Sequence, residues 1–225
     1  MLDKGGARGL AVALLALAAL AASGCGKAAP TSPAELALER EDLVVVARAL
    51  QSLAGQTESE VAATRAAWPS IAHGLPRRRT GLYPARVREA IESAGRLELP
   101  TVLDERNAAS LTGPAYGIAG LYREFTGLAS RGWGMLGGSI YQIEHGTPPA
   151  ARFARENAPL YIDSVYDAHF GLGQIGKQLL AAYSKLGGEA VFGEALTQAE
   201  ANGIAAVYSQ GHDRLQPHVG VTLGS

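Results

Sequence analysis

One histidine and two aspartates on a single predicted helix are the residues of this sequence best suited to metal chemistry. His169 belongs to a series of mostly apolar residues that recurs every three or four positions, and Asp167 and Asp163 precede it by two and six residues. Imidazole and carboxylate groups bind metal ions, and imidazole also binds haem iron. The same pattern fits a buried histidine that is held by a hydrogen bond. We therefore keep His169, Asp163 and Asp167 as a candidate ligand-binding set.

The motifs that would strengthen a metal or haem site do not occur. Bundle-type carboxylate sites need Glu-x-x-His on two helices, and the sequence contains neither this pair nor His-Glu-x-x-His nor Cys-x-x-Cys-His. We expect no resident cofactor and keep a metal- or haem-binding periplasmic protein as the alternative. There is also no G-x-S-x-G nucleophile motif, so the sequence favours a non-enzymatic protein without settling the point.

The segment GLGQIGK, Gly171 to Lys177, matches the dinucleotide-binding pattern G-x-G-x-x-G. Continued to Gly188, it resembles the glycine loop and helix of nicotinamide-dependent hydroxy-acid dehydrogenases. The resemblance implies a pyrophosphate bound at a helix N-terminus. The preceding VYDAHF is a poor strand, however, and the residues after Gly176 are too few to complete a doubly wound sheet. We expect a helix kink or close crossing here, with dinucleotide binding at Gly171–Gly176 as a remote alternative.

The N-terminal residues have the organisation of an export signal. Lys4 and Arg8 precede an apolar run from Leu10 to Ala22. A run of about a dozen residues is too short for a membrane-spanning helix, which needs about 20. We expect residues 1–24 to be removed as a signal peptide.

The end of this signal, LAASGC, places small residues directly before Cys25, the only cysteine of the chain. It resembles the lipobox of bacterial lipoproteins. The resemblance implies a thioether-linked lipid on Cys25, cleavage just before it and acylation of the new amino group, for example by palmitate. A large aliphatic residue usually stands where this chain has Ala22, so cleavage after Ala21 and release of a soluble protein stay open. The residue after the cysteine is Gly26 and not Asp, and by the usual sorting pattern of lipoproteins this favours the outer membrane in a cell that has one.

Charge gives little indication of a partner. Without Asp3, Lys4 and Arg8, the 20 basic and 21 acidic residues fall to 18 and 20, a net charge of −2. We expect no nucleic-acid partner. Arg77, Arg78 and Arg79 lie in the single cluster of like charge, which fits either a solvated loop or contact with anionic lipid head groups.

The remaining pattern predicts an all-α fold, an irregular antiparallel bundle of about six or seven helices. We expect residues 25–31 to be the lipidated cysteine with a short tether, 32–217 the bundle and 218–225 a tail. Ser32 and Glu35 form a capping box, and Thr57 with Glu60 repeats that signal after Gly55, so two helices forming a hairpin are expected before residue 74.

The second half of the chain has the clearest helical pattern. The glycine-rich region 113–146 is expected to form two helices. The strongest helical seam then consists of Ile162, Val165, His169, Leu172, Gly176, Leu179, Tyr183 and Leu186. Thr197 and Glu200 form a further start signal, so a last helix is expected over residues 197–212. The function expected from the sequence is a membrane-anchored extracytoplasmic lipoprotein, a binding or structural module of the cell envelope.

Overall fold

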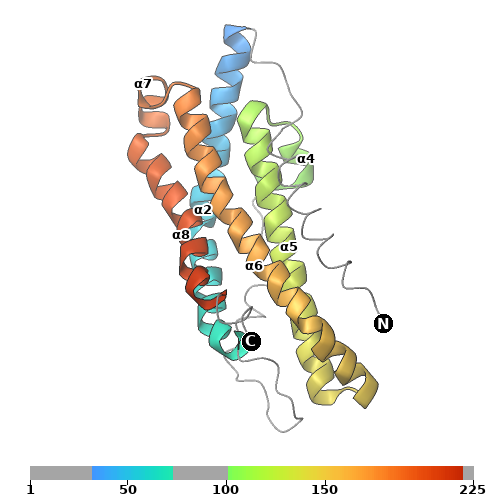
Figure 1. Ribbon diagram of the computed structural model, residues 1–225. Helices are drawn as coiled ribbons and strands as arrows, with labels where there is room; N and C mark the ends of the chain where they lie inside the picture. The colour runs from blue at the N-terminus through green and yellow to red at the C-terminus, as the bar shows by residue number, and fades with distance from the viewer. Residues whose placement is uncertain (1–31, 73–100, 220–225) are drawn as a thin grey trace, which may run out of the picture.

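The computed structural model describes residues 32–72 and 101–219, and in these ranges the chain is all-α, with no strand. The all-α prediction is therefore confirmed. The long helices are α2 (Pro33–Ala72), α5 (Gly113–His145), α6 (Pro148–Lys185) and α8 (Gln198–Val219) (Figure 1). The short ones are η1 (Thr101–Leu103), α4 (Glu105–Ala108), α7 (Glu189–Phe192) and η2 (Gly193–Ala195). None of the helices described is both long and apolar enough to cross a membrane.

Helix α2 begins where the sequence predicts but does not break where it predicts. The Ser32 amide donates to Glu35 Oε2 at 3.0 Å, and the Glu35 amide donates to Ser32 Oγ at 3.2 Å, which is the expected capping box. The predicted hairpin at Gly55 is wrong, because α2 is one continuous helix of 40 residues that passes through this glycine. The Thr57 hydroxyl donates to the Leu53 carbonyl at 3.1 Å, so this threonine bonds within the helix instead of capping a new one.

Helix α5 is also one element where two were predicted. It runs unbroken for 33 residues. The buried series passes through the glycine-rich centre without a gap, with Tyr122, Thr126, Ala129 and Trp133 all buried. A continuous buried stripe stabilises the helix across glycines that would weaken it in isolation.

The start of α8 is confirmed, and so is the seam of α6 at its described positions. Val165, Leu172 and Leu179 on α6 and Leu186 directly after it are buried as the seam requires, whereas the side chains of Ile162 and His169 lie outside the described part of the structure. Gly187 and Gly188 follow with φ of 120° and 57°, the left-handed region that glycine allows. Before α8, the amide of Thr197 donates to Glu200 Oε2 at 2.8 Å in a second capping box. The helix then runs to Val219, past the expected end at residue 212.

One end of the molecule gathers the beginnings of α2 and α5 and the end of α6. Asp42 Oδ2 accepts bonds from the Thr112 hydroxyl at 2.6 Å and the Thr112 amide at 2.8 Å. Arg40 Nε donates to the Leu186 carbonyl at 3.0 Å. We call this the clamped end. Helices α5, α6 and α8 follow one another in alternating directions, whereas α2 runs in the same direction as α8 (Figure 1).

The main hydrophobic core occupies the half of the molecule nearest the clamped end. It contains Leu43, Leu50, Ile118, Tyr122, Leu172, Leu179, Tyr183 and Tyr208, with contributions from all four long helices. On α5 its buried members extend no further than Tyr122, and on α6 they begin at Leu172. The remaining parts of α5 and α6, residues 126–145 and 148–168, pair with each other and end in a tip remote from α7 (Figure 1). We call this pair the distal hairpin.

Candidate interaction surfaces

The sequence-predicted ligand set lies on α6, at the base of the distal hairpin. The backbone of Asp163, Asp167 and His169 is helical, and Asp167 is exposed. The side chains of Asp163 and His169 lie outside the described part of the structure. Among the side chains that are described, no group of three or more histidine, cysteine, aspartate or glutamate residues could hold a metal ion.

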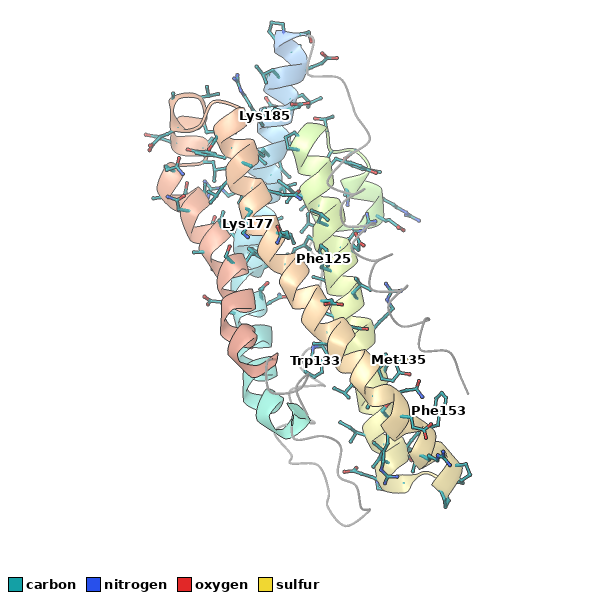
Figure 2. All side chains as sticks on the ribbon, viewed as in Figure 1. Phe125, Trp133, Met135, Phe153, Lys177 and Lys185 are labelled. Atoms are coloured by element: carbon teal, nitrogen blue, oxygen red, sulfur yellow. The ribbon has the colours of Figure 1, made fainter. Side chains whose placement is uncertain are left out.

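The GLGQIG segment lies inside α6, and its first and last glycines are helix contacts. A Cβ on Gly171 would strike the ring of Phe125, which lies between α5 and α6 (Figure 2). A Cβ on Gly176 would come within 2.6 Å of the Ala205 carbonyl oxygen of α8. A pyrophosphate loop needs free amides at a helix N-terminus, whereas residues 171–176 are helix interior. The glycines therefore allow close crossings, as the sequence suggested.

Two other sequence predictions, the lipidation of Cys25 and head-group contact by Arg77, Arg78 and Arg79, fall on residues outside the described ranges.

His145 is the last residue of α5 and is followed by Gly146, whose amide donates to the Gln142 carbonyl at 2.9 Å. Its position in the last turn of α5 is one that histidine commonly takes at helix ends, so a structural role explains this residue.

A charged cluster joins α2 to the start of α8. Arg48 Nη1 lies 2.9 Å from Glu200 Oε1, and Arg48 Nη2 donates to the Ala195 carbonyl at 2.8 Å. The bond from Arg48, followed by those from the Thr197 amide and hydroxyl, lowers the pKa of Glu200 to about 2. The glutamate therefore stays ionised through the neutral range and holds the two helices together.

Two tyrosines of the main core differ in their hydrogen bonding. The Tyr208 hydroxyl donates to the Leu50 carbonyl at 2.9 Å. The Tyr183 ring stacks on Phe192 with centroids 5.0 Å apart, and its buried hydroxyl has no hydrogen-bond partner in the described structure. Burial raises the pKa of Tyr183, and the charges of Glu189 and Glu200 raise it further. Neither tyrosine has the lowered pKa that a general base would need.

The distal hairpin exposes large apolar side chains. Phe153 is 64% exposed, Leu160 58% and Met135 54%. Phe153 and Leu160 are seven residues apart and so share one stripe of α6. Figure 2 shows Met135 and Phe153 along the same edge of the hairpin. We call these three residues the hairpin patch.

A second surface is the side of α5 opposite the one that packs on α6. Its residues recur at alternating intervals of three and four: Gly117, Gly120, Glu124, Gly127, Arg131, Gly134 and Gly138, with Tyr116 and Tyr141 near the ends. We call it the outer face of α5. A Cβ added to any of its five glycines would meet nothing within 4 Å. An exposed helical glycine costs about 1 kcal/mol relative to alanine, so the face is unfavourable for the isolated chain.

The sequence contained a signal for this surface that the apolar periodicity alone did not reveal. Five of the nine glycines of region 113–146 (Gly117, Gly120, Gly127, Gly134 and Gly138) fall on the three-and-four positions of the outer face, opposite the buried stripe of the helix. A search for periodic glycine, applied in the same way as the search for periodic leucine, would have found it.

Comparison of the chain with protein-family models, with curated proteins and with solved structures finds no match in any of the three.

Proposed function

We propose that this protein is a lipid-anchored, extracytoplasmic module of the cell envelope that binds another envelope protein through the hairpin patch. No resident cofactor and no reaction are part of the proposal. The observation that carries it is the hairpin patch itself, three large apolar side chains that are each more than half exposed on one hairpin. Exposed apolar clusters of this kind mark interaction sites in soluble domains.

The position of the patch along the molecule supports the proposal. Helix α5 has 33 residues, which at 1.5 Å per residue gives a length of about 50 Å. Helix α2 begins at the clamped end, and α5 begins there too, because Thr112 is bonded to Asp42. The tip of the distal hairpin is therefore about 50 Å from the start of α2, which supports a patch that stays accessible when the residues before α2 carry the proposed anchor.

The anchor is tested by Cys25→Ser in the native host. We expect the wild-type chain in the membrane fraction with a lipid-modified N-terminal cysteine, and the variant in the soluble fraction or unprocessed. Ser23→Ala, which keeps a small residue before the cysteine, is the matched control and stays membrane-bound. A soluble wild-type chain that begins at Ala22 would show ordinary signal cleavage instead of lipidation.

The partner is tested with a photo-crosslinking amino acid in place of Phe153 or Leu160 in intact cells. We expect the same major adduct with an envelope protein from both positions. The control is Leu38 on α2, which is 46% exposed but lies near the clamped end. Adducts that are identical at all three positions would mean non-specific contact and would contradict the proposal.

The metal or haem alternative at His169, Asp163 and Asp167 stays a prediction. Native mass spectrometry of the purified chain, before and after denaturation, tests it. Iron or haem that is present in the wild type and lost in His169→Ala would replace the proposed function.

A further inference from the structure

We propose that the outer face of α5 binds the same face of a second copy of this chain, in an antiparallel pair whose two-fold axis passes close to Gly127. The proposal goes beyond the binding of an envelope partner, because it concerns a different surface and a different occupant. It does not depend on the lipid anchor.

The charges of the outer face carry the inference. Glu124 and Arg131 are both exposed, and they lie three residues before and four residues after Gly127. Their separation of seven positions is roughly 10 Å along the helix, too far for an ion pair within one chain. In an antiparallel pair, each Glu124 comes opposite Arg131 of the partner subunit. The pair thus forms two equivalent ion pairs, whereas a parallel pair would bring Glu124 against its own copy.

The local bonding leaves both charged groups available for this contact. Arg131 Nε donates to the Gly127 carbonyl at 3.2 Å, which holds the side chain along the face. In the described structure, Glu124 makes no hydrogen bond or ion pair, and the terminal nitrogens of Arg131 have no acceptor.

The shape of the face has the same symmetry as its charges. Gly117 and Gly138 are related by the same centre as Glu124 and Arg131, and Gly120 and Gly134 lie seven residues on either side of Gly127. Because a Cβ at any of these glycines would meet nothing within 4 Å, a second helix backbone can come close. The exposed rings of Tyr116 and Tyr141 stand at the two ends and supply apolar contact area.

Helix contacts within the chain show how such glycines are used here. A Cβ on Gly132 of α5 would come within 2.7 Å of Val165 Cγ2 on α6, and Gly176 has a similar contact with Ala205. In both places a neighbouring helix occupies the space that the missing side chain leaves. On the outer face no described atom occupies the corresponding space.

The choice of a second copy follows from the two charges together. An acidic partner or an anionic membrane surface would place like charge opposite Glu124. A basic partner would place like charge opposite Arg131. A face that carries both charges in reverse order satisfies both residues. The antiparallel second copy supplies this face without further assumptions.

Disulfide crosslinking in the native host tests the pair with the full chain. Gly127→Cys places a thiol close to the proposed axis, where two copies approach within disulfide reach. Mild oxidation is expected to give a species of twice the chain mass. Gly203→Cys, on an exposed part of α8 that is also open to within 4 Å, is the matched control. We expect at least tenfold less dimer from that variant, and the wild-type chain reports any crosslink through Cys25.

Charge exchange separates the proposed contact from a general loss of structure. In the Gly127→Cys chain, Glu124→Arg and Arg131→Glu are each expected to reduce crosslinking at least fivefold. The double exchange is expected to restore it, because the two ion pairs re-form with their signs reversed. Co-purification of two differently tagged copies without any added cysteine gives the same comparison where Gly127→Cys folds poorly.

Any of four results would overturn the pair: no dimer from Gly127→Cys and no co-purification, an equal dimer yield from Gly203→Cys, a double exchange that fails to restore the contact, or a crosslink to a different protein. Adducts from Phe153 and Leu160 report on the proposed envelope partner and not on this pair. The two proposals therefore fail separately.

Discussion

At the scale of single residues, glycine has two opposite effects in this molecule, and its neighbours decide which one applies. Gly176 faces the backbone of α8, with the Ala205 oxygen 2.6 Å from the position of an added Cβ, whereas Gly203 faces open space. The first allows a helix crossing. The second only adds conformational freedom to the unfolded chain and weakens the helix.

Gly176→Ala should therefore destabilise the fold and Gly203→Ala should stabilise it. The added methyl group at position 176 meets backbone that cannot rotate away, and overpacking of this kind costs about 1–3 kcal/mol. Gly203→Ala should gain about 0.5–1 kcal/mol. Chemical denaturation of both variants measures the difference, and equal effects would show that the α6–α8 crossing is looser than described.

The two buried tyrosines make a second matched pair. Tyr208→Phe removes the donor to the Leu50 carbonyl and should cost about 1 kcal/mol. Tyr183→Phe removes a hydroxyl that has no partner in the described structure, so its stability should stay equal or rise. Denaturant melts of the two variants test this, and an equal loss in both would mean that Tyr183 has a bonded partner in solution.

Glu200 predicts a defined pH dependence. Its folded pKa of about 2 lies below the ordinary value of 4.5, so its ionised form stabilises the folded state. That contribution is fully present above the unfolded pKa and is lost as the pH falls towards 2. The stability difference between wild type and Glu200→Gln should therefore be constant from about pH 6 to 7 and shrink between about pH 4.5 and 2. Glu194→Gln, at an exposed position in η2, is the control variant.

At the scale of elements, the long helices persist through signals that usually end a helix. Gly55 and Thr57 resemble a stop and a new start, but the Thr57 hydroxyl bonds back to Leu53 inside α2. Local capping signals compete with the gain from a continuous buried face, and in α2 and α5 the continuous face is the stronger effect.

Gly55→Ala tests the continuity of α2 directly. Gly55 is exposed, its φ is not positive and an added Cβ meets nothing within 4 Å. In a continuous helix the substitution should stabilise the protein by about 0.5–1 kcal/mol. A loss of 1 kcal/mol or more would instead indicate a turn with positive φ at this position, as in the predicted hairpin.

At the scale of the whole molecule, the two halves are stabilised unequally. The half near the clamped end packs four long helices around one core, whereas the buried residues of the distal hairpin lie outside that core. The hairpin also buries Trp133 Nε1 and Arg155 Nε without an acceptor in the described structure. Unpaired buried donors of this kind cost free energy.

Hydrogen exchange should reveal this inequality. Amides of α6 between residues 151 and 165 should exchange at least tenfold faster than those between 172 and 186, because the hairpin can open while the main core stays intact. Binding of a partner to the hairpin patch should slow the faster set. Uniform protection along α6 in the free protein would contradict the division into two halves.

The sequence by itself determined the helical class, both capping boxes and the buried seam of α6, because these depend on contacts between residues three or four apart. Ser32 with Glu35 and Thr197 with Glu200 needed no tertiary information. The tertiary structure alone decided that α2 and α5 are continuous and that Gly176 is a crossing while the outer glycines of α5 are open. These features depend on what lies across from a residue in space, and residues such as Gly176 and Ala205, far apart in sequence, become neighbours only when the helices pack.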